Sequence, residues 1–157
     1  MSERSVTHAS FTIEREFAAP PARVFAAFAD PVAKARWFAG PPDWWQTEAT
    51  FDFRVGGRET NNGGPEGGPL HCFTAIYQDI VPNERIVFSY DMRLDDTPIS
   101  VSLTTIEFAP TTTGTRLRFT EQGAFLDGHD DPAGREEGTR WLLDALAAEV
   151  EQELALA

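Results

Sequence analysis

Glu121 is the side chain best suited to acid–base chemistry. It follows Leu117 and Phe119 at two-residue spacing, so in a strand it points to the same side as these two apolar residues. If that side is the interior, the carboxylate loses its water, which costs free energy unless an Arg or Tyr pairs with it. It would then hydrogen-bond a ligand or act as a general acid or base. The alternative is that Glu121 ends the strand and reaches water, as most carboxylates do.

Four further polar side chains are candidates for a site with that carboxylate: Arg58, His71, Tyr77 and Tyr90. Tyr90 shares a strand face with Phe88, and its hydroxyl either orients a ligand or is satisfied within the core. His71 begins a strand after a Gly-rich loop, which favours a position at the rim of a site. Arg58 either joins the site or pairs with an acidic neighbour, and the face occupied by Tyr77 stays open.

Aromatic side chains gather between residues 37 and 45: Trp37, Phe38, Trp44 and Trp45. They either form the aromatic lip of a pocket or pack two short helices against a sheet. Trp44 and Trp45 are adjacent, so they cannot both face inward on a regular strand. Trp141, near the C-terminus, faces either a cavity or the sheet. Phe is also frequent, with 12 residues, which suits a wide interior or an ordinary aromatic core.

The charge of the chain disfavours several classes of partner. The formal net charge is −12, and the 13 Lys and Arg residues are scattered, so we expect no binding to nucleic acid or to anionic membranes. No apolar run approaches the ~20 residues that span a membrane. Cys72 is the only cysteine, which rules out an intrachain disulfide and fits a reducing compartment. We therefore expect a cytoplasmic protein.

Motifs for several chemistries are missing. The three histidines, His8, His71 and His129, are far apart in the sequence, so we expect no metal site. The Gly-rich stretch 61–69 lacks the Gly-Lys-Ser/Thr of a phosphate-binding loop, and no Gly-x-Ser-x-Gly elbow occurs. We expect no cofactor.

A long C-terminal helix is predicted from Asp130 to Ala157, capped by Asp130 or Asp131 and with Pro132 in its first turn. Its apolar stripe repeats at three- and four-residue steps: Leu143, Leu146, Val150 and Leu154. Acidic residues, among them Glu149, are expected mostly on the other side. Only a broad partner could bury that stripe, and the rest of the chain supplies one in the form of strands.

Seven strands are expected, joined mainly by short turns into an antiparallel sheet. One of them, the third, follows the reversal at Gly56-Gly57. The sequence delimits the other six: Val6–Phe17, Trp44–Phe53, Leu70–Ile80, Arg85–Met92, Ile99–Phe108 and Thr115–Gln122. Residues 61–69 are expected to form a flexible loop, and the sixth strand to contain a bulge after Leu103. Two short helices follow the first strand, Pro21–Ala29 and a second that carries Val32, Ala35 and Phe38. The chain, residues 1–157, is thus predicted to form one α+β domain.

The order of these elements, and the letters at their joints, resemble the START-related superfamily, which has the helix-grip fold of the birch-pollen allergen. Within it the chain is similar to the branch related to the C-terminal domain of the activator of the 90-kilodalton heat-shock-protein ATPase. The matching stretches follow one another along the chain: Ala19–Phe25, Trp37-Phe38, Phe51–Arg58, Ile80–Ile86, Thr104–Phe108, Gly114–Leu117 and Thr120–Phe125. The resemblance implies a curved seven-stranded sheet wrapped around the long helix. Lipid carriers, polyketide cyclases and co-chaperone domains share this superfamily, so fold alone does not select an activity.

We expect a cavity between the sheet and the C-terminal helix that binds a small hydrophobic or aromatic molecule. Eleven residues are predicted to bind it: Trp37, Phe53, Arg58, Phe73, Phe88, Tyr90, Phe119, Glu121, Phe125, Trp141 and Ala145. One alternative is a cyclase- or hydrolase-like enzyme with Glu121 as acid/base and Tyr90 or Arg58 polarising the substrate. Another, implied by the resemblance alone, is a co-chaperone-like domain that binds a chaperone partner.

Overall fold

A computed structural model of the protein describes residues 3–156. Seven strands and three helices follow one another along the chain: β1 (Val6–Phe17), α1 (Pro21–Ala29), α2 (Pro31–Trp37), β2 (Trp45–Phe51), β3 (Arg58–Gly64), β4 (His71–Val81), β5 (Arg85–Leu94), β6 (Thr97–Pro110), β7 (Thr115–Leu126) and α3 (Pro132–Leu156). The predicted order of elements is confirmed, and most bounds agree within a few residues.

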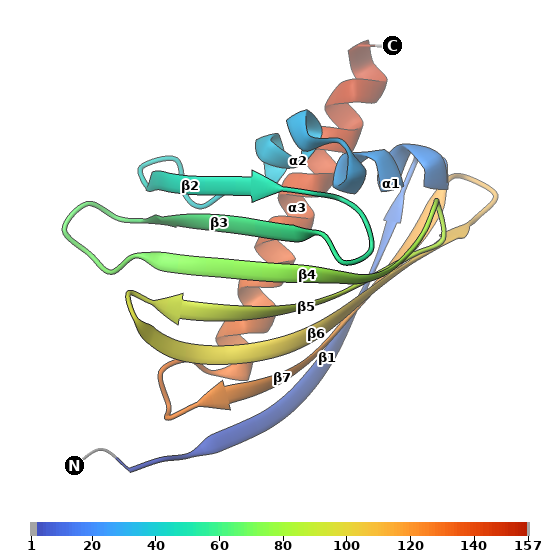
Figure 1. Ribbon diagram of the computed structural model, residues 1–157. Coiled ribbons are helices and arrows are strands. Elements are labelled where there is room, and N and C mark those ends of the chain that lie inside the picture. The colour runs from blue at the N-terminus through green and yellow to red at the C-terminus, as the bar shows by residue number, and fades with distance from the viewer. Residues whose placement is uncertain (1–2, 157) are drawn as a thin grey trace.

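The strands form one antiparallel sheet in the order β1-β7-β6-β5-β4-β3-β2. Strands β2 to β7 are neighbours in chain order, and β1 pairs with β7 along its whole length. Figure 1 shows the sheet curving around α3, which crosses one of its faces, while α1 and α2 lie beside the helix at one end. This arrangement is the predicted α+β helix-grip architecture.

Helix α3 buries the predicted apolar stripe against the sheet. Leu143, Leu146 and Val150 are almost completely buried, and the side chain of Leu154 lies outside the described residues. Asp131 caps the helix, because its Oδ1 accepts a hydrogen bond from the backbone N–H of Gly134 at 2.7 Å. Glu149 was expected on the polar side, but it is buried, with Arg36 of α2 pairing with its carboxylate at 2.7 Å.

Helices α1 and α2 pack aromatic rings against the end of the sheet. Phe28 of α1 meets Phe108 of β6 edge-on, with ring centroids 5.6 Å apart, and Trp37 of α2 at 5.0 Å. The apolar face expected for α2 is wrong, because Val32 is exposed and the helix instead buries Ala33, Lys34 and Trp37. A buried lysine was not foreseen, since sequence patterns treat Lys as a surface residue.

Residues 61–64 were expected to be part of a flexible loop, but they belong to β3 and pair with β2, and residues 61–63 also pair with β4. Glycine is required at Gly63, where a Cβ would lie 2.3 Å from the carbonyl oxygen of Trp45. The absence of a side chain at Gly63 thus lets the backbones of β2 and β3 approach closely. The composition of this segment is typical of a loop, but the segment forms a strand.

The bulge expected within β6 after Leu103 is also wrong. The register of β6 with β5 is continuous there and shifts instead between Met92 and Arg93, near the start of β6. Val101 and Leu103 are out of phase with the core because they face outward and are exposed. The inward positions hold polar residues that are fully or nearly buried: Ser100, Ser102 and Thr104. The inner face of β6 is therefore polar at one end and apolar at the other.

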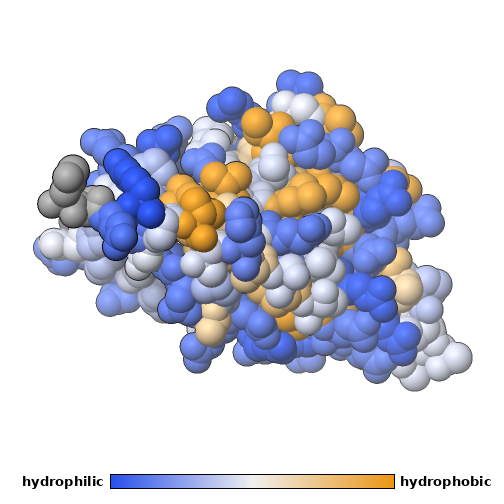
Figure 2. Space-filling view, turned by 90° about the horizontal axis from the view of Figure 1, so that it is seen from below, coloured by the Kyte–Doolittle hydropathy of each residue, from blue (hydrophilic) through white to orange (hydrophobic). Residues whose placement is uncertain are grey.

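The outer surface carries only scattered apolar side chains. Figure 2 shows one face, on which hydrophobic areas are separated by hydrophilic side chains. The exposed large hydrophobic residues of the described chain come from different elements, among them Val6 of β1 and Val32 of α2. Within residues 3–156, no helix has the length and apolar character needed to cross a membrane.

Candidate functional site

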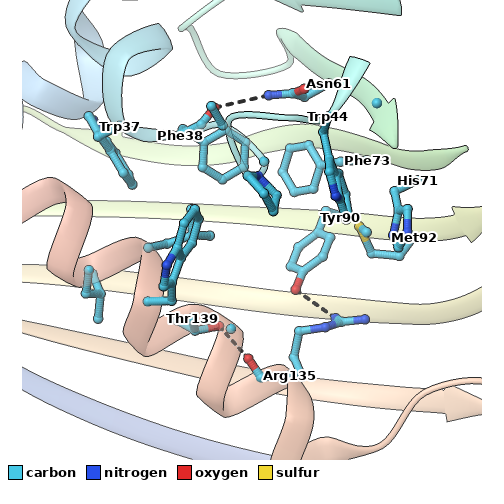
Figure 3. Close-up of a pocket in the computed structure, with 18 of the residues that line it drawn as sticks. Trp37, Phe38, Trp44, Asn61, His71, Phe73, Tyr90, Met92, Arg135 and Thr139 are labelled. Carbon is cyan, nitrogen blue, oxygen red and sulfur yellow. Dashed lines mark hydrogen bonds between the residues drawn. The ribbon is translucent and has the colours of Figure 1, made fainter. Parts of the chain in front are cut away.

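A cavity of about 560 Å³ lies between α3, the sheet and the segment that joins α2 to β2. Figure 3 shows aromatic side chains facing one another across it. Trp37 and Phe38 close one end, and Trp44 stands over the side that is formed by β4 and β5. The lining is mostly apolar, which is typical of sites for small molecules.

The sheet side of the cavity is built by alternation along two paired strands. Phe88, Tyr90 and Met92 share the inner face of β5, and Phe73 lies opposite Met92 on β4. The ring of Phe73 is 4.9 Å from that of Tyr90 and 5.2 Å from that of Phe38. These contacts form a continuous aromatic wall from α2 to β5.

The helix side of the cavity is lined by two glycines of α3. Gly134 and Gly138 are four residues apart and therefore lie on one face of the helix, in line with Trp141 and Leu142. A Cβ on Gly138 would meet no atom within 4 Å. Glycine within a helix costs about 1 kcal/mol relative to alanine. A Cβ on Gly134 would instead meet the Asp131 carboxylate at 3.4 Å, so only Gly138 leaves open space beside the helix.

A polar cluster occupies the end of the cavity where α3 begins. Glu121 of β7 is only 2% exposed, and its Oε2 accepts hydrogen bonds from the Tyr90 hydroxyl at 2.8 Å and the Ser102 hydroxyl at 2.9 Å. Arg135 of α3 completes the cluster, because its Nη1 donates to Tyr90 at 2.9 Å and lies 3.3 Å from Glu121 Oε2. Its Nη2 donates to Ser100 at 2.7 Å and to Asp130 at 2.8 Å. The cluster thus joins β5, β6 and β7 to the first turns of α3.

The Tyr90 hydroxyl is held in its neutral, proton-donating form. Burial raises the pKa of Tyr90 well above the usual value of 10, and the negative charge of Glu121 raises it further. Because Arg135 donates to the same oxygen, the Tyr90 proton is directed to the carboxylate. Thr104, opposite Glu121 in the register, is also fully buried, and its hydroxyl has no hydrogen-bond partner among the described residues.

A second polar cluster connects α2 to the sheet. Lys34 donates from Nζ to Glu59 Oε1 at 2.9 Å, and the Tyr77 hydroxyl donates to the same oxygen at 2.5 Å. The ammonium group lies 4.6 Å from the ring centre of Phe38. Burial lowers the pKa of Lys34, although the charge of Glu59 opposes that shift. Lys34 lines the cavity, whereas Glu59 and Tyr77 lie behind the wall.

His71 lies at the rim, as its place after the Gly-rich stretch indicates. It is half-buried, and its ring centre is 4.4 Å from that of Trp44. Burial lowers the pKa of His71, and the nearby charges of Asp130 and Asp95 oppose that shift. At neutral pH the ring therefore presents an aromatic surface to Trp44.

The structure brings seven of the eleven predicted residues to the cavity: Trp37, Phe73, Phe88, Tyr90, Phe119, Glu121 and Trp141. Glu121 takes the buried alternative, paired with both Tyr and Arg. Trp141 is 48% exposed, so it lies at the cavity mouth and not in the core. Trp44 and Trp45 both border the cavity, and Trp45 is the more exposed.

Four predicted residues lie outside the cavity lining. Arg58 is exposed because the next residue of β3, Glu59, takes the inward position. Phe53 follows the end of β2 and packs on Phe25 and Tyr77 in the core. The other two are Phe125, buried beneath the Arg135 guanidinium, and Ala145, packed against the core.

Sequence reasoning missed Arg135, Ser102, Lys34 and the two glycines. A signal for Arg135 and the glycines was available, because residues 134, 135, 138, 141 and 142 recur at helical spacing next to the predicted stripe. No comparable signal marked Lys34 or Ser102, because their burial depends on partners from distant elements.

Residues 18–151 match the model of the family described as Activator of Hsp90 ATPase homolog 1-like protein. An uncharacterized protein from Rhizobium leguminosarum is 46% identical, with a TM-score of 0.91 and coverage of 96% of this chain and 99% of that one. The Mll3558 protein from Rhizobium loti is 54% identical, with a TM-score of 0.86 and coverage of 92% and 99%.

An AHSA1-like protein from Aeromonas hydrophila is similar at 25% identity, with a TM-score of 0.71 and coverage of 92% of this chain and 94% of that one. The search of curated proteins gives no significant match. The family model covers most of the chain, and two of the solved structures are well above 30% identical over nearly their full length. The chain belongs to the family of Activator of Hsp90 ATPase homolog 1-like proteins.

Proposed function

We propose that the protein binds a small hydrophobic or aromatic molecule in the cavity between the sheet and α3. The observation that supports this most strongly is the cavity of about 560 Å³, walled by aromatic side chains and provided with one polar end. Sites for small molecules combine an apolar wall with a few placed polar groups in this way. Gly138 on α3 leaves open space at a cost in helix stability.

The apolar wall sets the expected strength of binding. A ligand that buries ~300 Å² gains about 7 kcal/mol at ~25 cal/mol per Å² of apolar surface. The loss of translational and rotational freedom removes part of that gain. Micromolar dissociation constants are therefore expected for ligands of this size.

Filling the cavity from the helix tests the proposal. Gly138 is exposed and lines the cavity, and a Cβ there meets nothing within 4 Å, so Gly138→Leu adds an apolar side chain at the cavity edge. We expect affinity for apolar fluorophores to fall at least tenfold, while thermal stability is kept or raised because leucine favours helix more than glycine does. Tryptophan emission and probe fluorescence measure binding.

Ala148→Leu is the matched control, because Ala148 is exposed and distant from the cavity lining on the same helix. It should bind the probes like the unmodified protein. The proposal fails if no apolar probe binds saturably to the unmodified protein, or if Gly138→Leu binds as well as Ala148→Leu does.

A second candidate function is acid–base catalysis in the same cavity. It is favoured by one observation, the 2.8 Å contact between Tyr90 and Glu121 on the cavity wall. Arg58 has no part in this candidate function, because it lies outside the cavity lining. For any substrate that is turned over, Glu121→Gln should lower kcat by about 10²-fold or more. Unchanged turnover would remove Glu121 from the reaction.

A further inference from the structure

We infer that the cavity selects neutral apolar molecules carrying a hydroxyl or N–H donor, and that it rejects carboxylates. This inference rests on the proposed function and specifies its ligand class. It depends on one atom, Glu121 Oε1. All three hydrogen bonds to this carboxylate end on the other oxygen, Oε2. None of the described residues donates to Oε1, although Glu121 is 2% exposed and lines the cavity.

Glu121 Oε1 therefore has open acceptor positions, because an ionised carboxylate has acceptor sites on both oxygens. The Tyr90 and Ser102 hydroxyls cannot supply the missing donor, and the Thr104 hydroxyl, opposite Glu121 in the register, forms no hydrogen bond to it. The Tyr90 proton is already directed to Oε2, and Ser102 donates there as well. A hydroxyl or N–H group at the end of an apolar ligand would complete the site with a charge-assisted hydrogen bond.

Arg135 is not free to receive an anion. Four hydrogen bonds occupy its two terminal nitrogens, with Tyr90, Glu121, Ser100 and Asp130 as acceptors. Only its Nε–H has no partner among the described residues. Two carboxylates, Glu121 and Asp130, face this single guanidinium, so the polar end carries one negative charge in excess.

The other lining cation is also engaged. Lys34 is paired with Glu59 at 2.9 Å, and the rings of Phe38 and Phe51 lie 4.6 and 5.2 Å from its Nζ. A carboxylate ligand would therefore enter a low-dielectric cavity with no uncommitted cation to receive it, and beside an unneutralised carboxylate. A hydroxyl donor meets neither obstacle.

Three naphthalenes of nearly the same shape separate these possibilities in calorimetric titrations of the full chain. We expect 2-naphthol to bind about tenfold or more tightly than 2-methoxynaphthalene, which lacks the donor but keeps the oxygen. We expect 2-naphthoate to bind at least tenfold more weakly than 2-methoxynaphthalene. Equal binding of the first two, or tightest binding by 2-naphthoate, would overturn the inference.

Glu121→Gln should reduce the advantage of 2-naphthol and relieve the penalty on 2-naphthoate, because it removes the charge and keeps the side-chain shape. Glu137→Gln is the matched control: it removes an equal charge from an exposed position on α3 and should leave the order of the probes unchanged. If Glu121→Gln does not fold, the order measured on the unmodified protein decides the question.

The two levels of the proposal fail differently. If none of the three naphthalenes binds saturably, the cavity is not a binding site and the proposed function fails. If 2-methoxynaphthalene binds but 2-naphthol gains nothing over it, the proposed function stands and the preference for donors is refuted.

Discussion

The protein contains two buried clusters of the same chemical type, each made of a tyrosine, a glutamate and a cation from a helix. In one, Lys34 of α2 joins Glu59 and Tyr77, and in the other, Arg135 of α3 joins Glu121 and Tyr90. Both hold a helix against the sheet. They differ in what they face, because all three members of the Arg135 cluster line the cavity and only Lys34 of the other does.

The comparison shows that the same set of groups takes different roles according to its place. In the Lys34 cluster, Glu59 accepts hydrogen bonds from both Lys34 and Tyr77, which ties α2 to the sheet. At the cavity end, the Arg135 cluster leaves one oxygen of Glu121 without a donor, in the cavity that we propose as a binding site. We therefore expect changes in the first cluster to act mainly on stability, and changes in the second to act mainly on binding.

The largest effect is expected from Lys34→Met. It leaves Glu59 buried without its cation, and removing one partner of a buried ion pair costs about 3–5 kcal/mol of unfolding free energy. Denaturant unfolding measures the loss. Replacing both partners, in Lys34→Met with Glu59→Leu, should recover a large part of it, whereas a single variant as stable as the unmodified protein would show that this cluster does not hold α2.

A smaller loss of stability, about 1–3 kcal/mol, is expected from Glu121→Gln. The amide oxygen still accepts from Tyr90 and Ser102, and Arg135 keeps its contact with Asp130. The same denaturant series compares it with Lys34→Met. The distinction between the clusters would break down if Glu121→Gln were the more destabilising change.

Both tyrosines of the chain belong to these clusters, so titration compares them directly. Burial, together with the neighbouring glutamate, raises the pKa of Tyr77 and of Tyr90. The folded protein therefore keeps protons that the unfolded chain releases above pH 10, and these tyrosines make stability fall as the pH rises beyond that value. Phenolate absorbance should appear only together with unfolding. Ionisation of either tyrosine near pH 10 in the folded protein would contradict its burial.

The smallest effect is expected at the cavity rim. Burial lowers the pKa of His71, so between pH 6.5 and the lower value of the folded state the unfolded chain binds more protons. His71 thus contributes stability that is present above pH 6.5 and is lost as the pH falls through this window. An NMR titration of the imidazole should give a midpoint below 6.5, and His71→Asn should flatten the acid side of the stability profile. A midpoint above 6.5 would show that the nearby aspartates outweigh burial.

The sequence was sufficient for the fold because alternation and helical spacing are local signals. The stripe of Leu143, Leu146 and Val150, and the alternation that carries Tyr90 inward, follow from the periods of helix and strand. The second half of β3, residues 61–64, escaped prediction because its Asn and Gly residues pair through the backbone, which composition does not reveal.

The candidate site was only partly predictable, because its polar groups depend on partners far away in the sequence. The alternation of side chains along β7 indicated that Glu121 points inward. Its pairing with Arg135, however, depends on where α3 crosses the sheet. The inward direction of the β6 serines was not predicted, because the apolar residues next to them, Val101 and Leu103, face outward. Arg58 was predicted to lie at the site because an inward-facing Glu59 was not expected. Glu59 takes the inward position, so Arg58 faces outward.

The central claim is that a small apolar molecule enters between the sheet and α3, and an NMR titration of backbone amides with 2-methoxynaphthalene tests it most directly. We expect saturable shifts for Phe73, Gly134 and Gly138, with the outward-facing Val101 and Leu103 unaffected. Shifts that never saturate, or that are largest at Val101 and Leu103, would contradict it.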